Sequence, residues 1–321
     1  MKKKSIKLIG SVAGIMLMTG SAAMAASISG TAFGNLELDQ TDGVTQEKAF
    51  NAPTVELGID HNVSDDVSAR IVLETNAVQN AYVTVSNLVP MATVKIGRQP
   101  TNAYSFQEAQ WGHRDIAESY LASHRSRADD GVSAKVEVHE KITATVGLSN
   151  GEGYGNAQDD AGELRTSIGA QINVIDGLNA AVRYDMMKGP DATDNTNDGE
   201  TIGLMAVAAG YQVMDNLSIG AEYNMVTGVK GLKSNDNTGL SAYGNFSIND
   251  KISAFGRYDS SKWDTASSDA ANNKDYTLLV AGVEYSLGNN VSTSVAYSAK
   301  DFDKADDTDI TQILVSTKFN F

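Results

Sequence analysis

Leu178-Asn-Ala-Ala-Val-Arg-Tyr184 is a heptapeptide whose pattern recurs three more times toward the C-terminus. The other copies are Leu217–Tyr223, Ile252–Tyr258 and Val291–Tyr297, and each runs from an aliphatic residue to a tyrosine six positions later. Strand side chains repeat every two residues, so both ends of each copy lie on one face of a β-strand. On a helix the same two residues would lie about 120° apart around the axis. The repeat therefore predicts β-strands with one apolar face.

The spacing of the repeat predicts the number of strands. The four tyrosines at positions 184, 223, 258 and 297 are 39, 35 and 39 residues apart. If each unit of about 38 residues holds one strand out and one strand back, the chain after residue 25 forms about 16 strands. The strands are expected at residues 27–39, 52–62, 67–75, 80–87, 92–98, 131–139, 141–149, 164–174, 178–187, 200–213, 216–226, 238–248, 251–262, 275–287, 290–301 and 309–321.

The connections between these strands alternate in length. Short turns are expected at 63–66, 88–90, 175–177, 214–215 and 249–250. Longer polar stretches lie between them at 40–51, 99–130, 150–163, 188–199, 227–237 and 263–274, with one exception at 76–79. This alternation is typical of a membrane barrel with tight turns at one end and longer loops at the other.

The two faces of the strands differ in polarity. Ile168, Ile172 and Val174 alternate with the polar residues Gln171 and Asn173. In hydrocarbon every backbone N–H and C=O must be bonded internally, so only a closed sheet can turn such a face to lipid. The sequence therefore predicts an all-β, closed antiparallel transmembrane β-barrel of about 16 strands. The alternative is a soluble sandwich that buries the same face in its core.

The first 25 residues have the three parts of a secretory signal peptide. Lysines at positions 2, 3, 4 and 7 precede an apolar stretch at 8–19, and Ala23-Met24-Ala25 forms a small-x-small cleavage site. Residues 1–25 are thus expected to be a signal peptide, and residues 26–321 the barrel; a buried N-terminal helix is the alternative. Removing the four lysines changes the net charge from −15 to −19. This acidity argues against a nucleic-acid partner.

Two motifs make the chain similar to a known family. Its last residues, Ser316-Thr-Lys-Phe-Asn-Phe321, alternate and end in an aromatic residue, and Gly97-Arg98-Gln99 opens a long loop after the fifth predicted strand. The mature chain resembles the general porins of Gram-negative bacteria. The resemblance implies a 16-stranded, usually trimeric outer-membrane channel whose third outer loop folds inward. It also implies that Phe319 and Phe321 signal assembly, although the second outer loop, which clasps a neighbouring subunit in that family, is nearly absent at 76–79.

The longest connection, residues 99–130, is the candidate constriction of such a barrel, whose lumen is wide enough for water. Ser105-Phe-Gln-Glu108 is a capping-box pattern that predicts a helix starting there. We expect basic wall residues to face acidic loop residues across the channel. The predicted constriction residues are Arg70, Lys95, Arg98, Glu108, Asp115, Glu118, Arg125 and Arg127, with Lys135, Arg165, Arg183, Glu222 and Arg257 on the lumen wall. The alternative is that these charges form ordinary ion pairs that hold the loop in place.

The favoured function is passive diffusion of ions and small hydrophilic solutes across the outer membrane, with a mild cation preference from acidic outer loops. A substrate-specific channel and a non-conducting structural or adhesive barrel are the alternatives. The expected partners are outer-membrane lipid and lipopolysaccharide, two further copies in a homotrimer, and the assembly machinery that reads the C-terminal strand. The chain has no Cys, its four His lack metal-ligand spacing, and no nucleophile motif occurs, so neither a cofactor, a metal nor an enzyme is expected.

Overall fold

The computed structural model describes residues 26–41, 44–51, 54–75, 77–156, 158, 163–189, 199–265, 274–303 and 308–321. The predicted signal peptide lies outside these ranges. Within them the strands form one 17-stranded antiparallel sheet. No helix of the described residues is long and apolar enough to cross a membrane.

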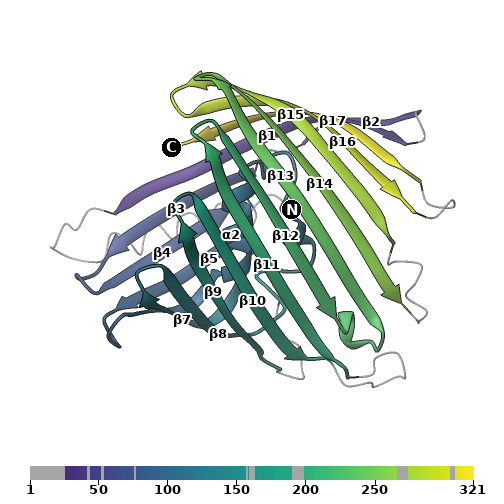
Figure 1. The fold of residues 1–321 in the computed structure, drawn as a ribbon. Helices are drawn as coiled ribbons and strands as arrows, with labels where there is room; N and C mark the ends of the chain where they lie inside the picture. Colours follow the sequence, from purple (N-terminus) through teal and green to yellow (C-terminus); the bar gives the residue numbers. More distant parts are fainter. Residues whose placement is uncertain are drawn as a thin grey trace, which may run out of the picture.

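The strands follow one another along the sequence and pair with their neighbours (Figure 1). They are β1 (Ser27–Thr41), β2 (Val44–Phe50), β3 (Thr54–Asn62), β4 (Val67–Glu74), β5 (Ala77–Ser86), β6 (Ala92–Pro100), β7 (Ala128–His139), β8 (Ile142–Ser149), β9 (Arg165–Ile175), β10 (Leu178–Lys188), β11 (Thr201–Met214), β12 (Leu217–Thr227), β13 (Asn235–Asn249), β14 (Ile252–Thr265), β15 (Tyr276–Gly288), β16 (Val291–Phe302) and β17 (Ile310–Asn320). The helical segments within the described residues are α2 (Asn102–Trp111), η1 (Tyr120–Ser123) and η2 (Val229–Gly231).

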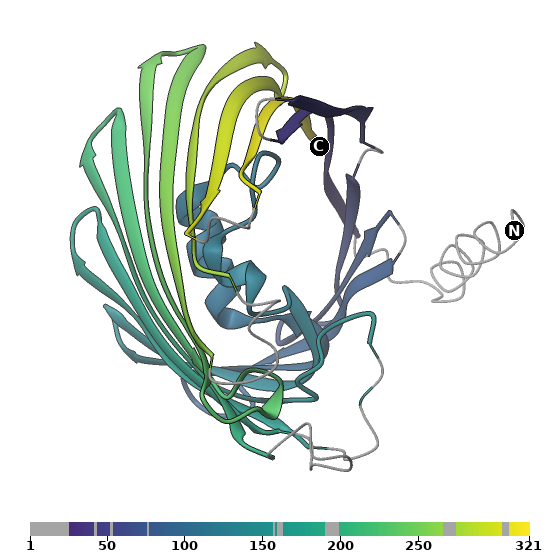
Figure 2. The same ribbon diagram turned by 90° about the vertical axis from the view of Figure 1, so that its right-hand side faces the viewer.

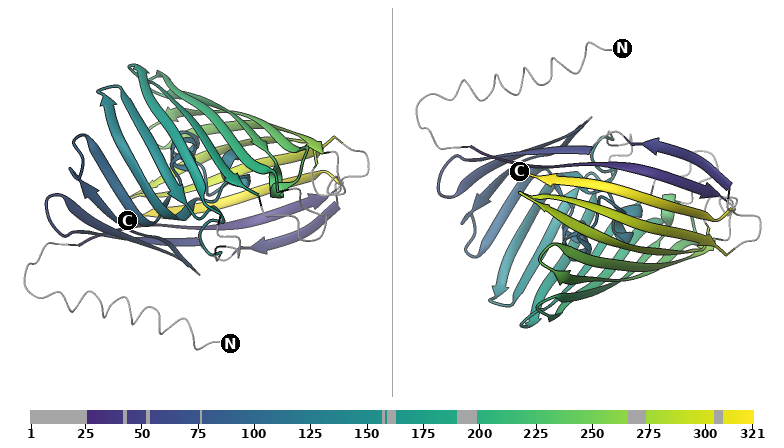
Figure 3. Two further views of the ribbon diagram at one scale, coloured as in Figure 1. Left: turned by 90° about the horizontal axis from the view of Figure 1, so that it is seen from below. Right: turned by 90° about the horizontal axis from the view of Figure 1, so that it is seen from above.

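Pairing between the first and last strands closes the sheet. β1 pairs with β17 from Thr31 opposite Asn320 to Thr41 opposite Ile310. Beyond that ladder, the Gly30 N–H donates to the Phe321 carbonyl at 2.8 Å and the Phe321 N–H donates back at 3.0 Å. A Cβ on Gly30 would lie 2.5 Å from the backbone carbonyl oxygen of Glu56, so only glycine fits there. Figure 3 shows β17, in yellow, beside β1, in purple, and this closure removes the sheet edges.

β2 is an extra strand that the sequence analysis missed. It pairs with β1 from Leu36 to Thr41, whereas β3 pairs with the other half of β1, from Ser27 to Phe33. β2 and β3 therefore share one of 16 positions around the barrel. The prediction of a loop at 40–51 was wrong, because a polar stretch such as Thr45-Gln-Glu-Lys48 carries no apolar alternation, and its strand exists through backbone pairing with β1.

The other predicted strands are confirmed to within a few residues, including the four repeats on β10, β12, β14 and β16. The repeat tyrosines point outward and are 40–45% exposed, and apolar residues along the same face, such as Ile168, Leu279 and Val283, are exposed too. Their alternates Asp185, Glu222 and Asp259 are buried on the inner face. The closed, all-β transmembrane barrel with an apolar outer face is thus confirmed, in place of a sandwich.

Val283→Arg tests the orientation of the outer face. Val283 is 46% exposed near the middle of β15. An arginine there should destabilise the barrel by about 2–4 kcal/mol, the cost of a cation near the bilayer midplane. Urea unfolding in lipid vesicles measures the difference, with Val283→Ala as the uncharged control. Equal effects of the two variants would contradict a lipid-facing position.

Candidate pore constriction

The connection between β6 and β7 contains α2 and η1. α2 begins at Asn102 after Thr101, whose backbone is extended, so the helix starts one turn earlier than the capping box predicted. The Ser105 hydroxyl instead donates to the Thr101 carbonyl at 3.5 Å, within the helix. The helix ends at Gly112, whose φ of 77° suits glycine and whose N–H donates to the Glu108 carbonyl at 2.9 Å.

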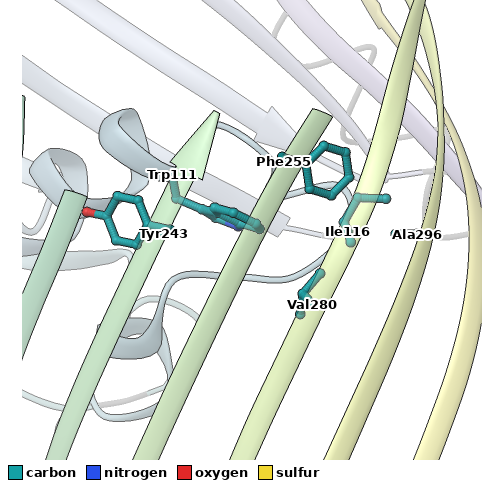
Figure 4. Packing of buried hydrophobic residues seen from close by; sticks show 6 residues of the cluster. All are labelled: Trp111, Ile116, Tyr243, Phe255, Val280 and Ala296. Carbon is teal, nitrogen blue, oxygen red and sulfur yellow. The ribbon is translucent and has the colours of Figure 1, made fainter. Parts of the chain in front are cut away.

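Trp111 is the apolar anchor of this segment. It is fully buried in a cluster with Ile116 and with wall residues of β13–β16, namely Tyr243, Phe255, Val280 and Ala296 (Figure 4). The Trp111 ring meets those of Tyr243 and Phe255 edge-on at centroid distances of 6.0 and 5.9 Å. Its Nε1–H donates to the Ala117 carbonyl at 2.7 Å, which satisfies the one polar atom of the indole. The cluster fixes the segment against the inner face of β13–β16.

Neutral polar contacts fix the same side. Tyr120 Oη donates to Asn237 Oδ1 at 2.8 Å and lies 3.0 Å from the Ser261 hydroxyl, and His113 Nε2 lies 2.8 Å from Asn245 Oδ1. Burial lowers the pKa of His113, lowers the pKa of His124 to about 4, and raises the pKa of Tyr120. All three side chains are therefore neutral at pH 7.

Ion pairs attach the segment to the strands that flank the closure. Arg114 lies 2.8 Å from Glu56 on β3, and Arg127 lies 2.8 Å from Glu74 on β4 and 3.4 Å from Glu56. Asp115 lies 3.3 Å from Lys318 on β17. The contacts thus extend from β13 through β17 to β4, and Figure 2 shows α2 within the ring of strands.

The predicted constriction residues do not pair as expected. Arg70 binds Asp60 at 2.6 Å and Arg98 binds Asp130 at 2.8 Å, so both find carboxylates on neighbouring strands. Glu118 lies 3.7 Å from Arg127, and Glu108 accepts the Ser119 N–H at 3.4 Å. Strand parity shows that a side chain points inward, but not which residue across the lumen it meets. The ion pairs that hold the loop in place match the alternative interpretation instead.

Arg125 lies in a buried charge cluster at β7–β10. Its Nε is 3.3 Å from Asp185 and its Nη2 is 3.6 Å from Asp129, while Arg183 contacts Asp185 at 2.6 Å. Burial lowers the pKa of Arg125 to about 10, so it stays charged at pH 7. Arg165 joins the same region by donating to the Gly151 carbonyl at 3.4 Å. Arg125 is therefore a structural residue, shielded from solutes.

The remaining predicted wall residues lie on the inner face. Glu222 is buried and accepts the Asn224 amide at 3.0 Å, while Arg257 binds Asp259 at 2.5 Å and donates to the Glu118 carbonyl. Glu56, Trp111 and Tyr120 were missed by the sequence analysis. A lone tryptophan in a polar loop was the available signal for Trp111.

A gap of about 180 Å³ separates α2 from the wall of β6–β10. Ser105 lines it on the helix side, and Lys95, Lys135 and Arg183 line it on the wall side, with Thr143 and Thr145 of β8 between them. Among the described residues that line this gap there is no carboxylate. The gap is therefore polar and basic where the segment approaches the wall.

A closed barrel with an apolar exterior, a polar interior and a segment anchored inside it defines a transmembrane channel of the outer membrane. The chain belongs to the Gram-negative porin family, whose model matches residues 11–321. No curated protein matches the chain.

Solved structures with the same fold cover nearly the whole chain at low sequence identity. The outer-membrane channel DcaP of Acinetobacter baumannii is 14% identical, with a TM-score of 0.70 over 94% of this chain and 99% of that one. The anion-selective porin from Comamonas acidovorans is 10% identical, with a TM-score of 0.68 over 92% and 99%. OmpF of Salmonella typhi, in complex with daunomycin, is 15% identical, with a TM-score of 0.68 over 92% and 97%.

Trp111→Ala tests the apolar anchor. Removing a fully buried tryptophan costs about 3–5 kcal/mol, which should release the segment from β13–β16 without opening the barrel. Trypsin should then cleave the folded protein faster after Arg114, Arg125 and Arg127. Phe246→Ala, which removes an exposed aromatic ring from β13, is the control. Unchanged cleavage of Trp111→Ala would show that the polar contacts alone hold the segment.

Low pH should loosen the same segment. The pKa of His124 is lowered from 6.5 to about 4 when the segment is packed on the wall. Between these two pH values the released segment therefore binds a proton at His124 that the packed segment does not. Docking is thus fully stable above about pH 6.5 and loses up to about 3 kcal/mol as pH falls through 4. Hydrogen exchange of residues 113–124 at pH 7, 5 and 4 measures this. The dependence should become shallower in His124→Gln, which leaves the buried His113 as the remaining contributor, but not in His139→Gln, which changes an exposed histidine. Equal curves for the two variants would refute the assignment.

Proposed function

We propose that this outer-membrane protein is a passive diffusion channel for ions and small hydrophilic solutes. The observation that carries the proposal is the gap between Ser105 of α2 and the basic wall of Lys95, Lys135 and Arg183. A segment fixed by an aromatic cluster and by ion pairs keeps such a gap at constant width. Charged side chains that line a narrow gap select among ions and polar solutes.

Two opposing sets of charges determine the ion preference in this proposal. The net charge favours cations at the outer mouth, through acidic loops that lie partly outside the described residues. The basic wall of the gap favours anions. Charges at the mouth are screened beyond about 8 Å at physiological salt, so we infer a mild cation preference at low salt that fades as salt rises.

Planar-bilayer recording tests both the channel and its preference. The wild type should insert in conductance steps, whereas a structural barrel with a blocked lumen would give none. Lys95→Ala combined with Lys135→Ala should raise the cation-to-anion permeability ratio roughly twofold or more, because two cations leave the gap. Arg70→Ala is the matched control, since Arg70 binds Asp60 on the wall. An unchanged reversal potential in the double variant would show that the gap does not lie on the conduction path.

We also propose a homotrimer that is assembled after removal of residues 1–25. A trimer form of the Vibrio cholerae outer-membrane protein OmpT, with a TM-score of 0.60 to this chain, supports the oligomer. The exposed outer face supports contact with lipid and lipopolysaccharide, and the C-terminal Phe319 and Phe321 stack at 5.4 Å where the assembly machinery would read them. Three equal closing steps in the recordings would agree with a trimer, and single independent closures would contradict it.

A further inference from the structure

A second cavity, of about 700 Å³, lies on the inner face of the barrel at the ends of β11, β12 and β14–β16 that carry the long connections. Its rings are Trp263 of β14, Tyr276 of β15 and Phe302 of β16. Its cations are Lys230 of η2, Lys274 and Lys300 of β16. His124 of the anchored segment lines the same cavity, so it lies in the outer vestibule, next to the constriction.

Lys300 is held by aromatic rings rather than by a carboxylate. Its ammonium lies 3.9 Å from the ring centroid of Tyr276 and 5.1 Å from that of Phe302. In the described part of the chain no ion pair involves Lys300, whereas the neighbouring Lys262 pairs with Asp275 and Asp303 outside the cavity. Cation–π contacts leave the ammonium able to accept an anion, since a ring satisfies none of its hydrogen-bond donors.

The charged side chains among the described residues that line this cavity are basic, whereas the chain as a whole is acidic. The sequence has 40 Asp and Glu against 25 Lys and Arg, yet the described residues that line the cavity include three lysines and no carboxylate. The remaining surface is aromatic and aliphatic, which suits an apolar body of drug-like size. His124 adds a ring without a charge, because its pKa is lowered to about 4, and its centroid lies 6.0 Å from that of Trp263.

We propose that this vestibule cavity binds aromatic carboxylates. The carboxylate would accept a hydrogen bond from the Lys300 ammonium, and the planar ring would pack among Trp263, Tyr276 and Phe302. An inorganic anion would use only the ammonium group, and a neutral aromatic compound would use only the rings. The proposal rests on the proposed function only in that the ligand enters from the outer mouth, because binding itself requires no conduction.

Titration of the detergent-solubilised full barrel with sodium benzoate tests the site. Trp263 lies in the cavity and the second tryptophan, Trp111, is fully buried, so tryptophan fluorescence reports on Trp263. We expect saturable binding with a dissociation constant on the order of 1 mM. Acetate, which lacks the aromatic ring, and benzyl alcohol, which lacks the carboxylate, should each bind at least about tenfold more weakly.

Variants locate the binding. Lys300→Gln should weaken benzoate binding at least about fivefold, and Lys300→Arg, which keeps the charge, should stay within about twofold of the wild type. Lys95→Gln is the matched control, since the Lys95 ammonium also lies over a tyrosine, at 5.0 Å from the Tyr82 centroid, but on the wall of the gap. Tyr276→Leu provides a second test if Lys300→Gln fails to fold, and it should weaken binding in the same way.

Several results would overturn the proposal. Non-saturable quenching, equal affinity for acetate, or equal losses in Lys95→Gln and Lys300→Gln would reduce the effect to general attraction of anions to the lumen. Full affinity in both Lys300→Gln and Tyr276→Leu would exclude this cavity. A barrel that binds benzoate but gives no conductance would refute the proposed channel and leave the binding site intact; the reverse result would refute only the site.

Discussion

Hydrogen bonding of the backbone in hydrocarbon is the constraint on which this structure depends. A strand edge facing lipid would leave N–H and C=O groups without partners, at a cost of several kcal/mol each. The seam between β1 and β17 removes both edges, and the reciprocal bonds of Gly30 and Phe321 extend it to the last residue. Once the sheet is closed, the alternation of side chains along each strand determines the two faces of the wall. One set of alternate residues faces lipid, and the other set encloses the lumen. The interior charges therefore need no apolar core around them.

The anchored segment solves a different problem, which is how to hold a long polar connection at a defined place in water. Two kinds of contact do this on two parts of the barrel wall. On β13–β16 the contacts centre on the aromatic cluster of Trp111 and on the hydrogen bonds of Tyr120, and Arg257 adds a hydrogen bond to the Glu118 carbonyl. Near the closure they are ion pairs of Arg114 and Arg127 with Glu56 and Glu74. Leu121 also packs against Leu204 of β11 and Val226 of β12. The position of the segment leaves a gap beside α2 that is lined by Lys95, Lys135 and Arg183.

The sequence patterns predicted most strands correctly but few contacts between side chains. The Leu178–Tyr184 repeat was sufficient to place β10, β12, β14 and β16 and to assign their outward face, because period-two patterning is local. It failed for β2, whose residues are mostly polar and which pairs with an irregular part of the wall. It also failed for the partners of Arg70 and Arg98. Parity gave the inward direction, but Asp60 and Asp130 were available on adjacent strands, at a register that only pairing defines.

The sequence by itself thus determined the class of fold, the number of strand positions and the two faces of the wall, since each follows from alternation and length along the chain. Only the tertiary structure decided which charges meet, where the segment rests and where aromatic and basic side chains gather in the vestibule. Trp263, Tyr276 and Lys300 come from three strands, and their distances depend on register and on strand tilt. These quantities arise when hydrogen bonds form between strands, and no single strand encodes them.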